Sequence, residues 1–234
     1  MIRLNDNICI IPARGGSKRI KKKNIKKFFD RPIISYVIKS LKKTRLFKEI
    51  IVSSDDNQIL KIAKSSGAKI HLRDKNLAND FIGTIPVIKN VILDLLKEKK
   101  NFEKVCCVYP TSLFFSKKSL LQAFKKLDKK KDYVFTAAKF SHPIERSFFR
   151  HKKKLKMNFQ SHYKTRTQNL KPSYYDAAQF YLGWKNSWLK EKNIFTGKND
   201  FIEFDEFNFQ DIDEKDDWSK AKIKWKLLKK KYLK

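Results

Sequence analysis

The chain has 234 residues, of which 41% are hydrophobic and 13% aromatic, so it can bury a full core and is not generally disordered. Its formal net charge is +31, from 55 Lys and Arg against 24 Asp and Glu. The sequence has no signal-peptide pattern and no apolar run of about 18 residues, so we expect a soluble, cytoplasmic protein that does not associate with membranes.

Apolar runs of strand length recur along the chain and alternate with helical patterns. This alternation predicts an α/β fold with a mostly parallel sheet and right-handed crossovers. Sheets of this kind bind ligands beyond the carboxyl ends of their strands. The predicted strands are residues 8–12, 49–53, 69–72, 104–109, 132–137 and 178–183.

Helical patterns fill the gaps between these strands. The first covers residues 31–43, with Asp30 as N-cap and Pro32 in the first turn, and the second runs from a cap at Ser54 to a stop at Gly67. A third begins near residue 84 and places four apolar side chains on one face, and the C-terminal helix carries a similar stripe. The two stripes are Ile85, Ile88, Ile92, Leu95 and Trp218, Ala221, Trp225, Leu228.

Regular patterning lapses between residues 139 and 175, where basic and aromatic residues alternate without a helical period. We interpret this stretch as an extended arm, or hairpin, inserted into a single domain of residues 1–234. The arm is a candidate dimer contact. The three cysteines, Cys9, Cys106 and Cys107, lie in apolar runs and are predicted to be buried thiols.

The first predicted strand runs directly into "ARGGSKRIKKKN", residues 13–24. Gly15 and Gly16 can adopt backbone angles closed to other residues and let amide groups approach an oxyanion, and Ser17 adds a hydroxyl. The surrounding cations complete the chemistry of a phosphate cradle, although a basic surface loop is the alternative. They are Arg14, Lys18, Arg19 and Lys23.

Near the C-terminus, Asp211 and Asp213 stand two residues apart in "QDID". In an extended segment that spacing directs both carboxylates to one face, where they could hold one or two magnesium ions. The alternative is that Asp213 caps the helix that follows.

Several motifs resemble the acylneuraminate-type cytidylyltransferases, enzymes that activate sialic-type sugar acids. "IPARGGSKR" with Lys23 and Asn24 resembles the family signature, and the likeness continues through most of the chain. Residues 165–170 and 174–184 resemble the branch that acts on pseudaminic acid, although Tyr175 and Ala178 replace a histidine and a glycine of that branch. The further matching stretches are "IIVSSDD" (50–56), "LRDKNLAND" (72–80), "TRTQNL" (165–170), "YYDAAQFYLGW" (174–184) and "FQDIDEKDDW" (209–218).

The resemblance implies a three-layer Rossmann-like nucleotidyltransferase fold, a homodimer joined through the arm, and Mg²⁺ held by Asp211 and Asp213. It also implies a reaction in which CTP and a nine-carbon acid give a CMP-sugar and pyrophosphate. The expected product is CMP-pseudaminic acid, with CMP-N-acetylneuraminate and CMP-legionaminate as alternatives. Arg14 and Lys23 are the expected catalytic cations, and the expected nucleotide-binding residues are Ala13, Arg14, Gly15, Gly16, Ser17, Lys18, Asn24, Arg73, Asp80 and Thr84.

A sugar acid needs a fixed cation or amide for its carboxylate. The candidates are Arg166, Gln168 and Gln179, with Tyr109 beside them, although Gln179 could be satisfied by backbone and Tyr109 could be a core residue. The positive charge leaves a lysine-rich nucleic-acid-binding protein as an alternative of a different class. Only nine residues are arginine, the side chain that nucleic-acid readers favour, so we expect no specific nucleic-acid partner.

Overall fold

The computed structural model describes residues 7–233, which fold around a seven-stranded sheet. The strand order is β11-β7-β10-β6-β1-β4-β5. All neighbouring strands pair in parallel except β10, which runs antiparallel to both β6 and β7. The strand bounds are β1 Asn7–Pro12, β4 Glu49–Ser54, β5 Lys69–Leu72, β6 Lys104–Cys107, β7 Tyr133–Lys139, β10 Tyr174–Trp184 and β11 Asn199–Glu203.

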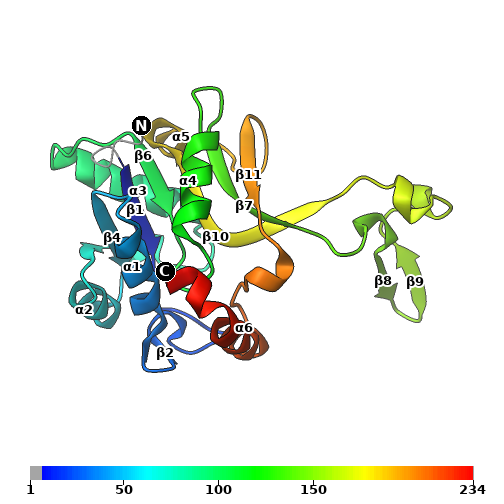
Figure 1. The fold of residues 1–234 in the computed structure, drawn as a ribbon, viewed down its shortest axis with the longest axis horizontal. Coiled ribbons are helices and arrows are strands. Elements are labelled where there is room, and N and C mark those ends of the chain that lie inside the picture. Colours follow the sequence, from blue (N-terminus) through cyan, green and yellow to red (C-terminus); the bar gives the residue numbers. More distant parts are fainter. Residues whose placement is uncertain (1–6, 234) are drawn as a thin grey trace.

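Helices cover both faces of the sheet, which gives the expected three layers (Figure 1). Side chains of β1 alternate between the two cores, because successive residues of a strand point to opposite faces. Cys9 and Ile11 pack with one set of helices, and Ile8 and Ile10 with the other. The first set is α1 Ile33–Thr44, α2 Asn57–Ser65, α4 Lys117–Lys126 and α6 Lys215–Leu233, and the second is α3 Thr84–Lys97 and α5 Lys185–Leu189.

The two predicted helical stripes are confirmed. Along α3, Ile88, Ile92 and Leu95 are buried, and Ile85 packs against the same core. Along α6, Trp218, Ala221 and Trp225 are buried and Leu228 lies partly buried beside them. The three cysteines are also buried free thiols, as predicted.

Both predicted helix caps are wrong. Asp30 does not cap α1; its carboxylate bonds Arg31 and the Tyr36 hydroxyl instead, and Pro32 is the N-cap. Ser54 is the last residue of β4, and α2 is capped by Asp56, whose carboxylate accepts hydrogen bonds from the backbone of Gln58 and Ile59. The strand continues further than its apolar run because β4 is paired on both sides.

Beyond the main sheet, two short hairpins complete the strands. β2 Lys27–Phe28 pairs with β3 Arg31–Pro32, and β8 Phe148–His151 pairs with β9 Lys154–Met157. The second hairpin belongs to an arm that leaves the body of the molecule where β7 and β10 run on past the sheet (Figure 1). Apolar side chains of this arm are exposed, among them Phe148, Phe149, Leu155 and Tyr163. No helix within residues 7–233 is long and apolar enough to cross a bilayer.

Candidate active site

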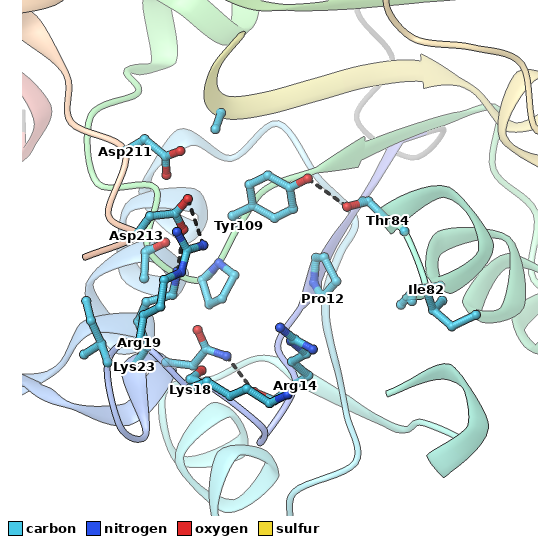
Figure 2. A pocket seen from close by; sticks show the side chains of 18 of the residues that line it. Pro12, Arg14, Lys18, Arg19, Lys23, Ile82, Thr84, Tyr109, Asp211 and Asp213 are labelled. Carbon is cyan, nitrogen blue, oxygen red and sulfur yellow. Dashed lines mark hydrogen bonds and ion pairs between the residues drawn. The ribbon is translucent and has the colours of Figure 1, made fainter. Parts of the chain in front are cut away.

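A cavity of about 440 Å³ opens beyond the carboxyl ends of β1 and β6 (Figure 2). The loop after β1 forms one side of it, and the start of α3 and the segment after β6 form the opposite side. The segment before α6 closes it with Asp211 and Asp213. The glycine loop and the distant aspartate pair therefore share one cleft.

The glycine loop is built differently from its prediction. Neither Gly15 nor Gly16 has a positive φ, so the loop does not depend on the left-handed region. Glycine at position 15 suits the close approach of Asp56, because a Cβ there would lie a tight 3.0 Å from the Cβ and Oδ2 of Asp56. Its amide N–H already donates to Asp55 Oδ1 at 3.0 Å. Asp55 therefore occupies one of the amides that a phosphate was expected to use.

Two cations of this loop are held by one carboxylate. Arg14 forms an ion pair with Asp80 Oδ1, and Lys18 with Oδ2 of the same residue. Hydrogen bonds from Lys18 and Arg14 lower the pKa of the Asp80 carboxyl. Arg14 and Lys18 line the cavity. Asp80 therefore neutralises the positive charge that a bound anion would otherwise contact.

A second group of charges joins the loop to the C-terminal segment. Lys23 Nζ donates to the carbonyl oxygen of Ile212 at 2.7 Å and to Asp213 Oδ1 at 3.2 Å. Arg19 lies 3.2 Å from Asp213 Oδ2. Figure 2 shows Arg19 and Lys23 both extending toward Asp213, with Asp211 above it.

Asp211 is charged without a direct cation partner among the ion pairs of residues 7–233. Partial burial in the cleft wall and the neighbouring Asp213 carboxylate raise the pKa of Asp211 to about 6, although Lys23 opposes the shift. Two neighbouring carboxylates, of which Asp211 has no cation partner among the described ion pairs, are suitable ligands for a divalent cation. No described group of three or more His, Cys, Asp or Glu could hold a metal alone, so substrate oxygens or water would have to complete such a site.

Arg73 and Asn24 support the opposite part of the cavity. Arg73 is 4% exposed. Its guanidinium Nη2 donates a hydrogen bond to the carbonyl oxygen of Ser53 at 2.7 Å. Burial lowers the pKa of Arg73 to about 10, which still leaves it charged at neutral pH. Asn24 donates from Nδ2 to the carbonyl oxygen of Arg14 at 2.8 Å and so braces the loop.

Tyr109 and Thr84 form the far wall, their hydroxyls 2.7 Å apart (Figure 2). Burial raises the pKa of Tyr109, so its hydroxyl stays neutral. These two residues also line a second, more apolar cavity of about 540 Å³ next to the first. Tyr181, Ile194 and Phe195 also line this second cavity.

Some predicted site residues lie outside the cavity. Ala13 is fully buried and Gln179 is 1% exposed, with its amide bonded to the backbone of Phe114 and Ala177. This geometry agrees with the backbone-satisfied alternative for Gln179. Arg166 and Gln168 are exposed on the arm, away from the cleft of their own chain.

Several cavity residues were not predicted from the sequence, and two of them lie on β10. Asp176 and Ala178 line the main cavity from an irregular part of β10, where the pairing register with β7 shifts. Ala178 has φ 51°, in the left-handed region. A carboxylate within an otherwise apolar and aromatic strand was the available signal for Asp176.

Comparison with known proteins identifies the family of the chain. The sequence profile of the cytidylyltransferase family matches residues 8–226. The chain is 38% identical over 224 residues to a pseudaminic acid cytidylyltransferase of Campylobacter jejuni, covering 94% of this chain and 97% of that one. It is 34% identical to an N-acylneuraminate cytidylyltransferase of Escherichia coli, over 50% of this chain and 27% of that one.

Solved structures show the same fold. A CMP:2-keto-3-deoxy-manno-octonic acid synthetase complexed with CTP superimposes with a TM-score of 0.68 at 11% identity, covering 97% of this chain and 99% of that one. A 4-diphosphocytidyl-2C-methyl-D-erythritol synthase superimposes with a TM-score of 0.62, over 94% and 97% of the two chains.

Proposed function

The chain belongs to the cytidylyltransferase family and is a CTP-dependent nucleotidyltransferase, and from that premise we propose that it converts CTP and pseudaminic acid into CMP-pseudaminic acid and pyrophosphate. One observation carries the proposal: the loop cations and the aspartate pair, almost 200 residues apart, line one cavity. The 38% identity to a pseudaminic acid enzyme over 94% of this chain favours this sugar. The legionaminic acid enzymes match shorter stretches, and an N-acylneuraminate enzyme that matches over 91% of this chain is only 28% identical.

Arg14, Lys18 and Lys23 would bind the triphosphate. Charge builds on the phosphoryl and pyrophosphate oxygens during transfer, and preorganised cations stabilise it. In the structure these cations are paired with Asp80 and Asp213. We therefore expect the triphosphate to displace these carboxylates. Arg73, Asn24, Thr84 and Asp80 remain the proposed contacts of the cytidine part, with Ala13, Gly15, Gly16 and Ser17 shaping the loop.

Mg²⁺ is the proposed cofactor, held by Asp211 and Asp213. When bound, it would neutralise phosphate charge in the cleft. Lys23 and Arg19 are placed to take up part of the same charge from the protein side. Protein groups alone would otherwise have to stabilise the whole of a departing pyrophosphate.

The sugar acid would extend from the phosphate cleft into the adjoining apolar cavity. Tyr109 lies on the wall between the two cavities, and Phe195 lines the apolar one. Such a wall suits the apolar parts of a deoxygenated, acylated sugar better than it suits bare hydroxyls. The sugar's carboxylate would then face the cationic side of the cleft.

We further propose a homodimer that uses the arm. Isolated exposed apolar side chains are ordinary, but several gathered on one hairpin mark an interaction surface. Arg166 and Gln168 stay predicted sugar contacts. Because the arm carries them away from their own cleft, a second copy of the chain would have to bring them to the sugar.

The deciding experiment is pyrophosphate release with CTP and a panel of pseudaminic, N-acetylneuraminic and legionaminic acids. We expect Mg²⁺-dependent turnover with the highest kcat/KM for pseudaminic acid. A preference for another acid would change the sugar and keep the reaction. Absence of turnover with the whole panel would overturn the proposal.

A further inference from the structure

Asp176 stands at the junction of the two cavities. It lines the charged cleft together with Lys23 and Asp211, and it also lines the apolar cavity together with Tyr181 and Phe195. Among the described residues that line both cavities, Asp176 is the one carboxylate. A substrate with its nucleotide end in the first cavity and its sugar end in the second must pass this side chain.

An irregularity of β10 directs the carboxyl group into this position. Residues five apart in a regular strand point to opposite faces, yet the Tyr181 hydroxyl donates to Asp176 Oδ2. The register of β10 against β7 shifts between these two residues, which turns both side chains to one side. The Ala178 amide donates to Asp176 Oδ1 at 2.8 Å. The carboxylate is therefore fixed in orientation before any substrate binds.

The surroundings of Asp176 differ from those of the other carboxylates in or beside the cleft. Asp80 and Asp213 each pair with two cations, whereas Asp176 has no ion pair among those found in residues 7–233. Tyr181 bonds Asp176, and Asp176 in turn acts electrostatically on Tyr181, Tyr109, Cys107 and Asp211, none of them a cation at neutral pH. Burial raises the pKa of Asp176, with hydrogen bonds from Tyr181 and Ala178 acting against the shift.

We propose that Asp176 is the general base that accepts the proton of the attacking sugar hydroxyl. This inference rests on the proposed function. As the hydroxyl oxygen bonds to the α-phosphorus of CTP, its proton moves to a carboxylate oxygen of Asp176. The bond from the α-phosphorus to the bridging oxygen breaks, and that oxygen leaves with pyrophosphate and the bonding electron pair. The proton then passes from Asp176 to water.

The remaining carboxylates in or beside the cleft are less suited to this step. A carboxylate held by cations is a weak base, because the cations favour its charged form. Asp80 and Asp213 are held in this way, and Asp211 and Asp213 are the proposed metal ligands. A base also has to lie within hydrogen-bond reach of the sugar, and Asp176 is the carboxylate that extends into both cavities.

The test compares Asp176→Asn with the wild-type chain in pyrophosphate release from CTP and pseudaminic acid, over about pH 6 to 9.5. Loss of a general base lowers kcat by about 10²- to 10⁴-fold. We expect a loss in that range with unchanged CTP affinity in calorimetry. The wild-type rate should level off above an acidic limb, whereas the variant should keep rising roughly tenfold per pH unit as hydroxide replaces the base.

Tyr181→Phe keeps the carboxylate and removes one hydrogen bond to its charged form, which raises the pKa of Asp176. The acidic limb of the pH–rate profile of Tyr181→Phe should therefore move to higher pH. A purely structural role of Asp176 would not produce this shift. Asp128→Asn, in the turn before β7 and away from both cavities, is the charge control.

The possible outcomes separate the role of Asp176 from the proposed function. If the wild-type chain turns over and Asp176→Asn keeps its rate, or keeps the wild-type pH profile at lower amplitude, the inference is overturned and the proposed function stands. If Asp176→Asn does not fold by circular dichroism, an unmoved limb in Tyr181→Phe overturns the inference. If the wild-type chain releases no pyrophosphate with any sugar acid, the proposed function and this inference are both overturned.

Discussion

Lys23 Nζ lies 3.2 Å from Asp213 Oδ1, across 190 positions of the sequence. The same ammonium group donates to the carbonyl oxygen of Ile212, so it is held at two points beside the aspartate pair. This contact fixes the glycine loop against the segment before α6. A triphosphate that binds between them meets a cation whose position is already set.

Lys23→Ala should lower kcat/KM by about 10²-fold or more, comparable to the loss of one preorganised charge stabiliser. Lys22→Ala is the matched control, because the Lys22 ammonium bonds Gln58 and does not line the cavity. Steady-state pyrophosphate release measures both variants. Equal, small changes in the two would remove Lys23 from the catalytic machinery.

Asp211→Ala should abolish Mg²⁺-dependent turnover and leave the fold intact, since Asp211 lines the cleft and belongs to neither hydrophobic core cluster. Asp216→Ala is the control: Asp216 lies exposed in the first turn of α6, outside the cavity. Activity is titrated against Mg²⁺ for both. Retention of the wild-type metal dependence in Asp211→Ala would contradict the ligand assignment.

The raised pKa of Asp211 predicts a pH-dependent stability. Its pKa is about 6 in the folded chain, against about 4 in an unfolded one, so the folded chain binds the extra proton between these values. The stabilisation is complete below about pH 4 and is lost as the pH rises through about 6. Asn at position 211 does not ionise, so Asp211→Asn does not lose this stabilisation. The difference between its Tm and the lower Tm of the wild type, both measured in EDTA, should therefore grow up to about pH 6.5.

Asp128→Asn should behave in the opposite sense, because a hydrogen bond from Lys131 lowers the pKa of Asp128. Its carboxylate stabilises the fold at neutral pH, and this stabilisation is lost as the pH falls through the lowered pKa. A Tm difference for Asp211→Asn that does not vary with pH would show that Asp211 titrates normally.

Ala178→Gly should raise the free energy of unfolding by about 1 kcal/mol. Ala178 has φ 51°, a conformation that costs an L-residue roughly 1–2 kcal/mol and glycine little. The gain is offset in part by the greater chain entropy that glycine loses on folding. Ala177→Gly, at a buried neighbour without positive φ, should destabilise the chain instead. Urea unfolding of both variants checks the contrast, and destabilisation by both would refute it.

Local patterns determined the layered α/β fold. The strand runs at 8–12, 49–53 and 69–72 and the apolar stripes of α3 and α6 are confirmed, because burial of one face leaves a period in the sequence. The glycine loop after the first strand could be placed in a cleft for a similar reason, since parallel strands expose their carboxyl ends at one edge.

The tertiary structure alone decided which polar groups meet. Asp55 takes the Gly15 amide across 40 positions, and Asp80 holds Arg14 across 66. The shift in β10 places Asp176 beside Tyr181, which no strand period predicts. Hydrophobic burial imposes a repeat that can be read along the chain, whereas a hydrogen bond or ion pair depends on the distance between two atoms, and only the folded backbone sets that distance.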